Sequence, residues 1–418
     1  MSPYIASYLK YRTNNTWVTN GDMVWIFSLA VFSQAFTMSL GGLLEKKIGP
    51  RLTCWIGSWT MSLGTVLTYF AIKYNLWAVI VTYGFIFGIG TGLTYSVALA
   101  TPMKWFPLHR GLVAGAVVAG YGLGSLIFNI IQTQFINPMN VSPNSTLTVE
   151  KYFTDPGVLD NIPLCFVLIG VIYSIIQFIG VVLLINPDVK KYYDDEEKLL
   201  DETSSIEENE LSVPTGRDYE VMESVRECRF WILWSTFFFN GVVIVTISSL
   251  YKSFGQTFIS NDKFFAIVGA IAAVFNSGGR LIWGRLLDTF SYRRIMSTLT
   301  ILMSIVMGTF YFSSMIKSVL IGQIVYAIYV CLLFFCLAGS FAMLPATTSH
   351  CFGSTNLAIT YGIVFTGYAM SSILGALVTS NLLEVIEYWG QFLLATCSAI
   401  ISLILTQFFP TKSSRLSK

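Results

Sequence analysis

Two stretches of the sequence share one pattern and decide how the chain is organised. Residues 42–51 read GLLEKKIGPR, and residues 284–294 read GRLLDTFSYRR. Each stretch follows a long apolar run, begins with glycine, passes a charged position and ends in basic residues. Charged groups that face a helix terminus can hold two helices together and release them when halves of a protein move. We therefore predict two related halves, each with one signature loop; the signature residues are Gly42, Glu45, Lys47, Gly49 and Arg51 in the first and Gly284, Asp288 and Arg293 in the second.

The composition is that of a membrane protein. Of the 418 residues, 54% are hydrophobic and only 11% are charged, and the mean hydropathy is +0.65. Soluble proteins carry about 25% charged residues. These values argue against a soluble enzyme, a nucleic-acid-binding protein and a disordered protein. The seven cysteines and two histidines form no metal-binding spacing and no nucleophile–base pair, so we expect no metal, no cofactor and no enzymatic activity.

Eleven apolar runs are long enough to cross a bilayer, which needs about 20 residues each. Because a spanning segment must satisfy its own backbone groups in lipid, each run is predicted to be a helix. Residues 1–9 would span only about 14 Å as a helix, which is too short for a bilayer core of about 30 Å. The eleven runs are residues 22–44, 52–72, 76–103, 111–135, 162–186, 229–254, 264–284, 295–315, 318–344, 357–380 and 388–409.

Lysine and arginine predict the orientation of the spans. If residues 45–51 are cytoplasmic, the cytoplasmic loops and tail hold 17 Lys and Arg residues and the outer loops hold seven. The glycosylation sequons at Asn14, Asn140 and Asn144 then all lie outside. Residues 187–228 contain 14 acidic residues and are predicted to be a disordered cytoplasmic linker. The predicted domains are an N-terminal bundle (1–186), this linker (187–228), a C-terminal bundle (229–410) and a tail (411–418).

The signature loops resemble those that join helices 2 and 3 and helices 8 and 9 in the major facilitator superfamily. Residues 104–115 (KWFPLHRGLVAG), 119–124 (AGYGLG), 276–284 (NSGGRLIWG) and 360–365 (TYGIVF) are similar to the oxalate/formate antiporter branch and, more distantly, to monocarboxylate transporters. The resemblance implies an all-α polytopic membrane protein of two pseudo-symmetric bundles. The family has twelve helices, so we expect eleven full spans here, with residues 1–9 as an N-terminal stub of the first helix. Aligned from Gly49, the first loop has Lys46 where the family has aspartate, whereas the second loop keeps Asp288.

Arg280 stands out because it lies deep in a predicted span. It precedes Asp288 by eight residues, or about 12 Å of helix, which places it near the bilayer midplane. An arginine at that depth is costly unless it faces a partner or a wet cavity. It could bind a carboxylate through two parallel hydrogen bonds, or it could be held by backbone carbonyls as part of helix packing. We expect it to bind a substrate anion.

The resemblance sharpens this expectation. Arg280 matches the helix-8 arginine that binds carboxylate in both related families. Tyr368 stands where oxalate transport uses a second cation, which favours a monocarboxylate over a dianion. Asn276 stands where proton-coupled carriers have an aspartate, which favours uniport or exchange. Further candidates for the cavity are polar or aromatic residues inside spans, although such residues often only bond neighbouring helices; they are Gln34, Tyr95, Tyr121, Asn240 and Tyr329.

The sequence thus predicts a secondary transporter of a small organic anion that works by alternating access. A non-transporting membrane sensor, or a truncated inactive carrier form, is the alternative. The expected partners are the anion and the lipid bilayer, without nucleic acid. Residues 195–200 (DEEKLL) and 219–222 (YEVM) resemble sorting signals, so adaptors could bind the linker. The expected location is the plasma membrane, with an endosomal or lysosomal membrane as the alternative.

Overall fold

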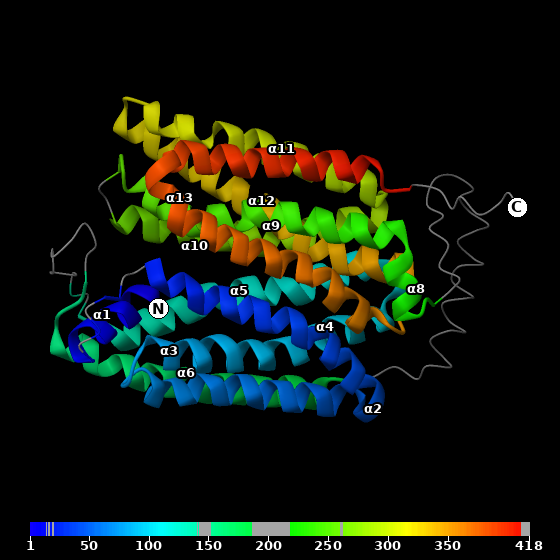
Figure 1. Ribbon diagram of the computed structural model, residues 1–418, viewed down its shortest axis with the longest axis horizontal. Coiled ribbons are helices and arrows are strands. Elements are labelled where there is room, and N and C mark those ends of the chain that lie inside the picture. The colour runs from blue at the N-terminus through cyan, green and yellow to red at the C-terminus, as the bar shows by residue number, and fades with distance from the viewer. Residues whose placement is uncertain are drawn as a thin grey trace, which may run out of the picture. The chain divides into compact units, whose positions relative to one another are not determined.

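The computed structural model describes residues 1–13, 15, 17–18, 21–139, 141, 152–185, 218–259 and 262–410 (Figure 1). The predicted sequons at Asn14, Asn140 and Asn144, the dileucine motif and the C-terminal tail lie outside these residues. The helices of the first half are α1 (Ser2–Arg12), η1 (Gly21–Met23), α2 (Val24–Ala71), α3 (Leu76–Val79), η2 (Ile80–Ile86), α4 (Phe87–Trp105), η3 (Pro107–His109), α5 (Arg110–Ile136) and α6 (Pro156–Leu183). Those of the second half are α8 (Val221–Arg226), α9 (Cys228–Gly255), α10 (Asp262–Thr289), α11 (Tyr292–Phe310), η4 (Tyr311–Met315), α12 (Val319–Phe352) and α13 (Leu357–Gln407).

Within the described residues, ten helical segments are long and apolar enough to cross a membrane, and one of them accounts for two predicted spans. This segment, α2, has 48 residues, or about 72 Å of helix, which is far more than a core of about 30 Å requires. Gly49 divides it, with φ 81° and ψ 166°, a conformation that side chains other than glycine rarely adopt. At Glu387 a positive φ of 53° similarly divides α13 into two spans. All eleven predicted runs are therefore helical, as predicted.

The start of one helix differs from the predicted start of its span, and helix capping explains the difference. Helix α6 begins at Pro156, six residues before the predicted start of its span. The Asp155 side chain accepts a hydrogen bond from the Val158 amide at 3.1 Å, and Pro156 occupies the first turn. Both features favour a helix start. Hydropathy locates the apolar part of a span but not the polar turn that begins the helix.

The described chain forms two compact helical units. Unit 1 comprises residues 1–97 and 124–185, and unit 2 comprises residues 98–123 together with the described residues from 218 onward. The second part of α4 and the first part of α5 thus belong with the C-terminal helices, whereas the predicted domains follow the chain without a break. In unit 2, α9 packs along α13 and α10 packs along α12 (Figure 1).

A glycine seam joins α2 and α4 in unit 1. A Cβ added to Gly88 would lie 2.4 Å from the Ala30 carbonyl oxygen, and one added to Gly92 would lie 2.4 Å from that of Gln34. The small-xxx-small spacing of these two glycines therefore does allow close backbone approach. The equally spaced Gly120 and Gly124 do not act in this way, since a Cβ at either position would meet no described atom within 4 Å.

The N-terminal segment forms a short helix, in agreement with the predicted stub. Helix α1 has 11 residues, or about 16 Å, and buries Ile5 and Leu9 in the core of unit 1. Arg12 forms an ion pair at 2.6 Å with Asp160 on α6. This contact fixes the end of α1 against α6.

The predicted linker is partly folded. Its last residues form an extended stretch at 218–220 and then α8, which contacts α9 and α13. The prediction of a disordered linker is therefore wrong for residues 218–228, because contacts with residues more than 100 positions later hold this stretch. Residues 187–217 lie outside the described part of the chain.

Candidate functional site

Arg280 is the buried cation at the centre of the candidate site. Its side chain on α10 is only 4% exposed. Its Nε donates a hydrogen bond at 3.2 Å to Oδ1 of Asn276, one turn earlier, and its Nη1 donates to the backbone carbonyl of Val118 on α5. The guanidinium also lies 5.2 Å from the centre of the Phe341 ring on α12. These three contacts are made with a side-chain amide, a backbone carbonyl and an aromatic ring.

A line of glycines lets α5 and α10 touch along this site, within unit 2. A Cβ added to Gly115 would lie 2.3 Å from the Arg280 carbonyl oxygen, and one added to Gly111 would lie 2.3 Å from that of Gly284. At Gly122 the added atom would lie 2.5 Å from Oγ of Ser277. Real Cβ atoms essentially never come this close to backbone oxygens, so glycine is needed at positions 111 and 115, whereas the Ser277 side chain could turn away from a Cβ at position 122. We call this contact the α5–α10 seam.

An aromatic cluster supports the arginine from the other side. Phe341 meets Tyr368 edge to face, with ring centres 5.1 Å apart, and Tyr368 stacks on Phe237 at 5.4 Å. Tyr368 is 5% exposed and is thus linked to Arg280 through the Phe341 ring. Tyr121 lies one turn after Val118 on α5 and is 58% exposed. The structure therefore brings together Arg280, Asn276 and Tyr368 of the predicted residues.

The other predicted cavity residues occupy different places. Asn240 on α9 is fully buried and donates at 3.2 Å to Oγ of Ser340, a bond between helices. Tyr329 on α12 donates at 3.0 Å to Oγ1 of Thr309, also a bond between helices. Gln34 and Tyr95 belong to unit 1. The bonds of Asn240 and Tyr329 favour the packing alternative for these two residues.

Three contacts of the site could not be predicted from the sequence. The Val118 carbonyl is a backbone group, which no residue pattern marks. Phe341 is one of 32 phenylalanines, and its position over Arg280 depends on how α12 is rotated. Gly115 was visible as a glycine in the matched motif, but its contact with the Arg280 backbone was not.

Asp288 of the second signature loop closes one end of the α5–α10 seam. Its two carboxylate oxygens accept hydrogen bonds from the backbone amides of Gly111 and Leu112, at 2.7 and 2.8 Å. These amides lie in the first turn of α5, where helical amides have no partner within their own helix and the helix dipole attracts negative charge. A carboxylate from the end of α10 thus caps the start of α5.

The two signature loops use their basic residues in related ways. Arg51 donates from Nε to the Leu184 carbonyl at 2.5 Å, just beyond the end of α6. Arg293 donates from Nε to Oε1 of Gln407 at 3.3 Å, at the end of α13. In each unit, a basic residue at the start of a span therefore binds the end of that unit's last span, which agrees with the predicted repeat. Gly42, Glu45 and Lys47 lie on α2 before the Gly49 turn, and Gly284 lies on the seam.

We predict that Asp288→Asn weakens the cap on α5, because an amide offers one accepting oxygen where the carboxylate offers two. Loss of one hydrogen bond costs about 1 kcal/mol net. Hydrogen exchange at the Gly111 and Leu112 amides should become about fivefold to tenfold faster. As a matched control, Asp155→Asn should affect only the start of α6. Unchanged exchange at Gly111 and Leu112 would contradict the capping role.

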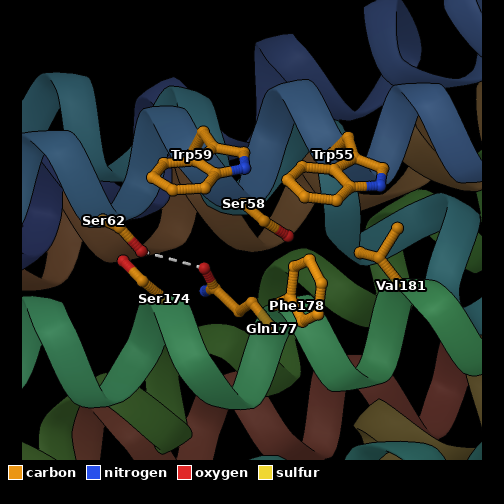
Figure 2. A pocket seen from close by; sticks show the side chains of 8 residues that line it. All are labelled: Trp55, Ser58, Trp59, Ser62, Ser174, Gln177, Phe178 and Val181. Atoms are coloured by element: carbon orange, nitrogen blue, oxygen red, sulfur yellow. Dashed lines mark hydrogen bonds between the residues drawn. The ribbon is translucent and has the colours of Figure 1, made fainter.

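A small pocket in unit 1 does not compete with this site. It lies between α2 and α6, where Ser62 donates at 2.9 Å to Oε1 of Gln177 beside the stacked rings of Trp55 and Trp59 (Figure 2). Its volume of about 10 Å³ has room for about one water molecule. It holds no charged residue and is too small for an organic anion.

Comparison with known proteins decides the family. The profile of the Major Facilitator Superfamily matches residues 1–376. The chain belongs to the Major Facilitator Superfamily. Two solved superfamily structures share its fold. The E. coli fucose:proton symporter FucP has a TM-score of 0.64 at 14% identity and covers 98% of this chain and 97% of its own. The proton:xylose symporter XylE has a TM-score of 0.67 at 13% identity and covers 98% and 91%. The protein is thus a multi-pass membrane transporter of this superfamily and not an enzyme.

Two curated proteins are similar to this one over most of the chain. Apicoplast pyruvate carrier 1 of Toxoplasma gondii is 29% identical across 95% of this chain and 76% of its own length. The oxalate:formate antiporter of Oxalobacter formigenes is 26% identical across 98% and 87%. Monocarboxylate transporter 13 of Rattus norvegicus is 32% identical over a shorter stretch, 25% of this chain and 24% of its own. These findings agree with the branch that the sequence motifs indicated.

Proposed function

We propose that this protein carries a small organic anion with a single carboxylate across a membrane by alternating access. The observation that carries the proposal is Arg280, a buried guanidinium that contacts the Val118 carbonyl, the Asn276 amide and the Phe341 ring. A carboxylate accepts stronger hydrogen bonds from a guanidinium than a neutral carbonyl does, and it accepts two at once. An incoming carboxylate would therefore compete successfully with the Val118 carbonyl.

The number of charges favours a monoanion. Tyr368, which stands where the resemblance implies a second cation, is neutral and buried among Phe237, Phe341 and Phe365. A second carboxylate near this aromatic cluster would lose its hydration without gaining an opposite charge, which is costly. Pyruvate and formate, which the names of the relatives mention, carry one carboxylate each, whereas oxalate carries two.

Competition for Arg280 also supplies a way to couple binding to movement. The bond from Arg280 to Val118 links α10 to α5 at the seam. When substrate takes over the guanidinium, this link is lost and the seam is left with its glycine contacts and the Asp288 cap. Asn276 cannot exchange a proton at physiological pH, so uniport or exchange fits better than proton symport.

The proposed location is the plasma membrane, with an endosomal or lysosomal membrane as the alternative.

The test is substrate competition in liposomes that contain the purified full chain. We predict uptake of labelled pyruvate that unlabelled formate inhibits at least tenfold more effectively than oxalate. Tyr368→Lys should narrow this difference by adding a second cation, and Tyr368→Phe is the matched control without a new charge. Equal inhibition by oxalate would contradict the monoanion assignment. Absence of uptake with every carboxylate would instead favour the non-transporting alternative.

A further inference from the structure

We infer that residues 218–222 form a strap that docks on unit 2 and holds the Tyr219–Met222 motif in a masked state. A partner protein could bind the motif only after the strap dissociates from unit 2. The partner is a protein with one pocket for a tyrosine ring and another for the aliphatic side chain three residues later. This inference does not depend on which substrate is carried.

The strap is attached at the turn between α12 and α13. The Asp218 carboxylate accepts hydrogen bonds from the Thr355 hydroxyl and, at 3.4 Å, from the Thr355 amide. Asn356 donates from Nδ2 to the Tyr219 carbonyl at 2.6 Å, and the Tyr219 amide donates to the Phe352 carbonyl at 3.1 Å. Side chains and backbone of the strap are therefore both engaged by residues 352–356.

The turn is shaped to accept Asp218. Gly353 has φ 87°, and a Cβ at this position would collide with the Asp218 carboxylate. The bonds to Thr355 lie just before the first turn of α13, so the negative charge of Asp218 also faces the positive end of that helix. The first part of α13 is the counterpart of α5 in the predicted repeat, and Asp288 caps α5 in a similar way. Each of these two helices thus has an aspartate from another segment at its start.

Docking hides the tyrosine. The Tyr219 hydroxyl accepts a hydrogen bond at 3.2 Å from Nη2 of Arg229 on α9, and its ring meets Phe352 edge to face at 5.9 Å. Residues Val221–Arg226 are helical as α8, which lies beside α9 in Figure 1, so Tyr219 and Met222 do not form one extended stretch. Met222 is 64% exposed, whereas Tyr219 is only partly exposed. A partner that needs both side chains in extended chain must first undock the strap.

The test compares Asp218→Ala with Glu220→Ala in the purified full chain. Both variants remove one acidic side chain from an exposed position of the same segment, but only Asp218 binds Thr355. In Asp218→Ala, hydrogen exchange at the Tyr219 amide should become at least tenfold faster. Glu220→Ala should exchange like the unaltered chain. Equal exchange in all three proteins would overturn the docked strap.

A binding assay tests whether docking of the strap masks the Tyr219–Met222 motif. The probe is the purified cargo-binding subunit of a clathrin adaptor, which recognises tyrosine-based motifs. Asp218→Ala should bind the probe at least tenfold more tightly than the unaltered chain and Glu220→Ala, and the added Tyr219→Ala substitution should abolish this gain. Equal binding by Asp218→Ala and the unaltered chain would overturn the masking. Binding that survives Tyr219→Ala would overturn the assignment of the motif.

Discussion

Replacement of Arg280 by lysine or alanine should lower the kcat/KM for pyruvate uptake at least a hundredfold. Arg280→Lys keeps a positive charge but cannot offer the planar pair of donors that a carboxylate accepts. Hydrogen bonds to charged groups contribute about 1.5–3 kcal/mol, and every 1.4 kcal/mol is about a factor of ten. Uptake into liposomes, normalised to the amount of reconstituted protein, measures the effect. Uptake within threefold of the unaltered protein in both variants would contradict the binding role.

The matched control is Arg285→Ala, on the same helix. Arg285 is exposed, whereas Arg280 is buried, so the control removes the same side chain outside the site. It should keep most of the uptake. The unfolding temperature of Arg280→Ala, measured beside that of Arg285→Ala, separates a loss of binding from a loss of folding. A large fall in that temperature would mean that Arg280 serves packing, as the alternative interpretation states.

The sequence predicted the spans well because membrane insertion is a local property. Apolar length alone located all eleven runs, and Gly49 could be recognised as a turn between two of them. Local patterns say less about which face of a helix meets which partner. The glycine pair at Gly120 and Gly124 has the spacing of a packing motif, yet the glycines that touch α10 are Gly111, Gly115 and Gly122. Spacing reports that a helix can pack closely but not the direction in which it does so.

The candidate site illustrates the same limit. Arg280 was found because a charge in an apolar run is unusual. Its contacts with Val118 and Phe341 join segments 162 and 61 positions away, and one of them is a backbone group. The strap was missed for a related reason: acidic composition predicts disorder, but Asp218 and Tyr219 bind residues more than 130 positions later. Composition averages over a segment, whereas a few specific bonds decide whether part of it folds.

Gly115→Ala should reduce pyruvate uptake at least tenfold by preventing closure of the α5–α10 seam. The new Cβ would lie 2.3 Å from the Arg280 carbonyl oxygen, against an ordinary carbon contact of about 3.5 Å, so the helices must move apart by about 1 Å. Gly120→Ala is the matched control, because no described atom lies within 4 Å of its added Cβ. Both changes replace glycine by alanine inside a helix, which stabilises the helix by about 1 kcal/mol in each case. Equal uptake by the two variants would contradict a role of the seam in transport.

Accessibility of a cysteine in the seam to a thiol reagent distinguishes a defect in seam closure from a defect in substrate binding. Ser277 is 4% exposed and faces Gly122 across the seam, so a cysteine placed there by Ser277→Cys reports whether the seam is closed. Gly115→Ala should make this cysteine react faster with a water-soluble thiol reagent than Gly120→Ala does. Arg280→Lys should leave the reaction slow, because a lysine ammonium can still donate to the Val118 carbonyl and the glycine contacts and the Asp288 cap remain. The two losses of uptake would then have different causes: in one the guanidinium remains but the helices cannot close, and in the other the helices close but the carboxylate has no bidentate partner.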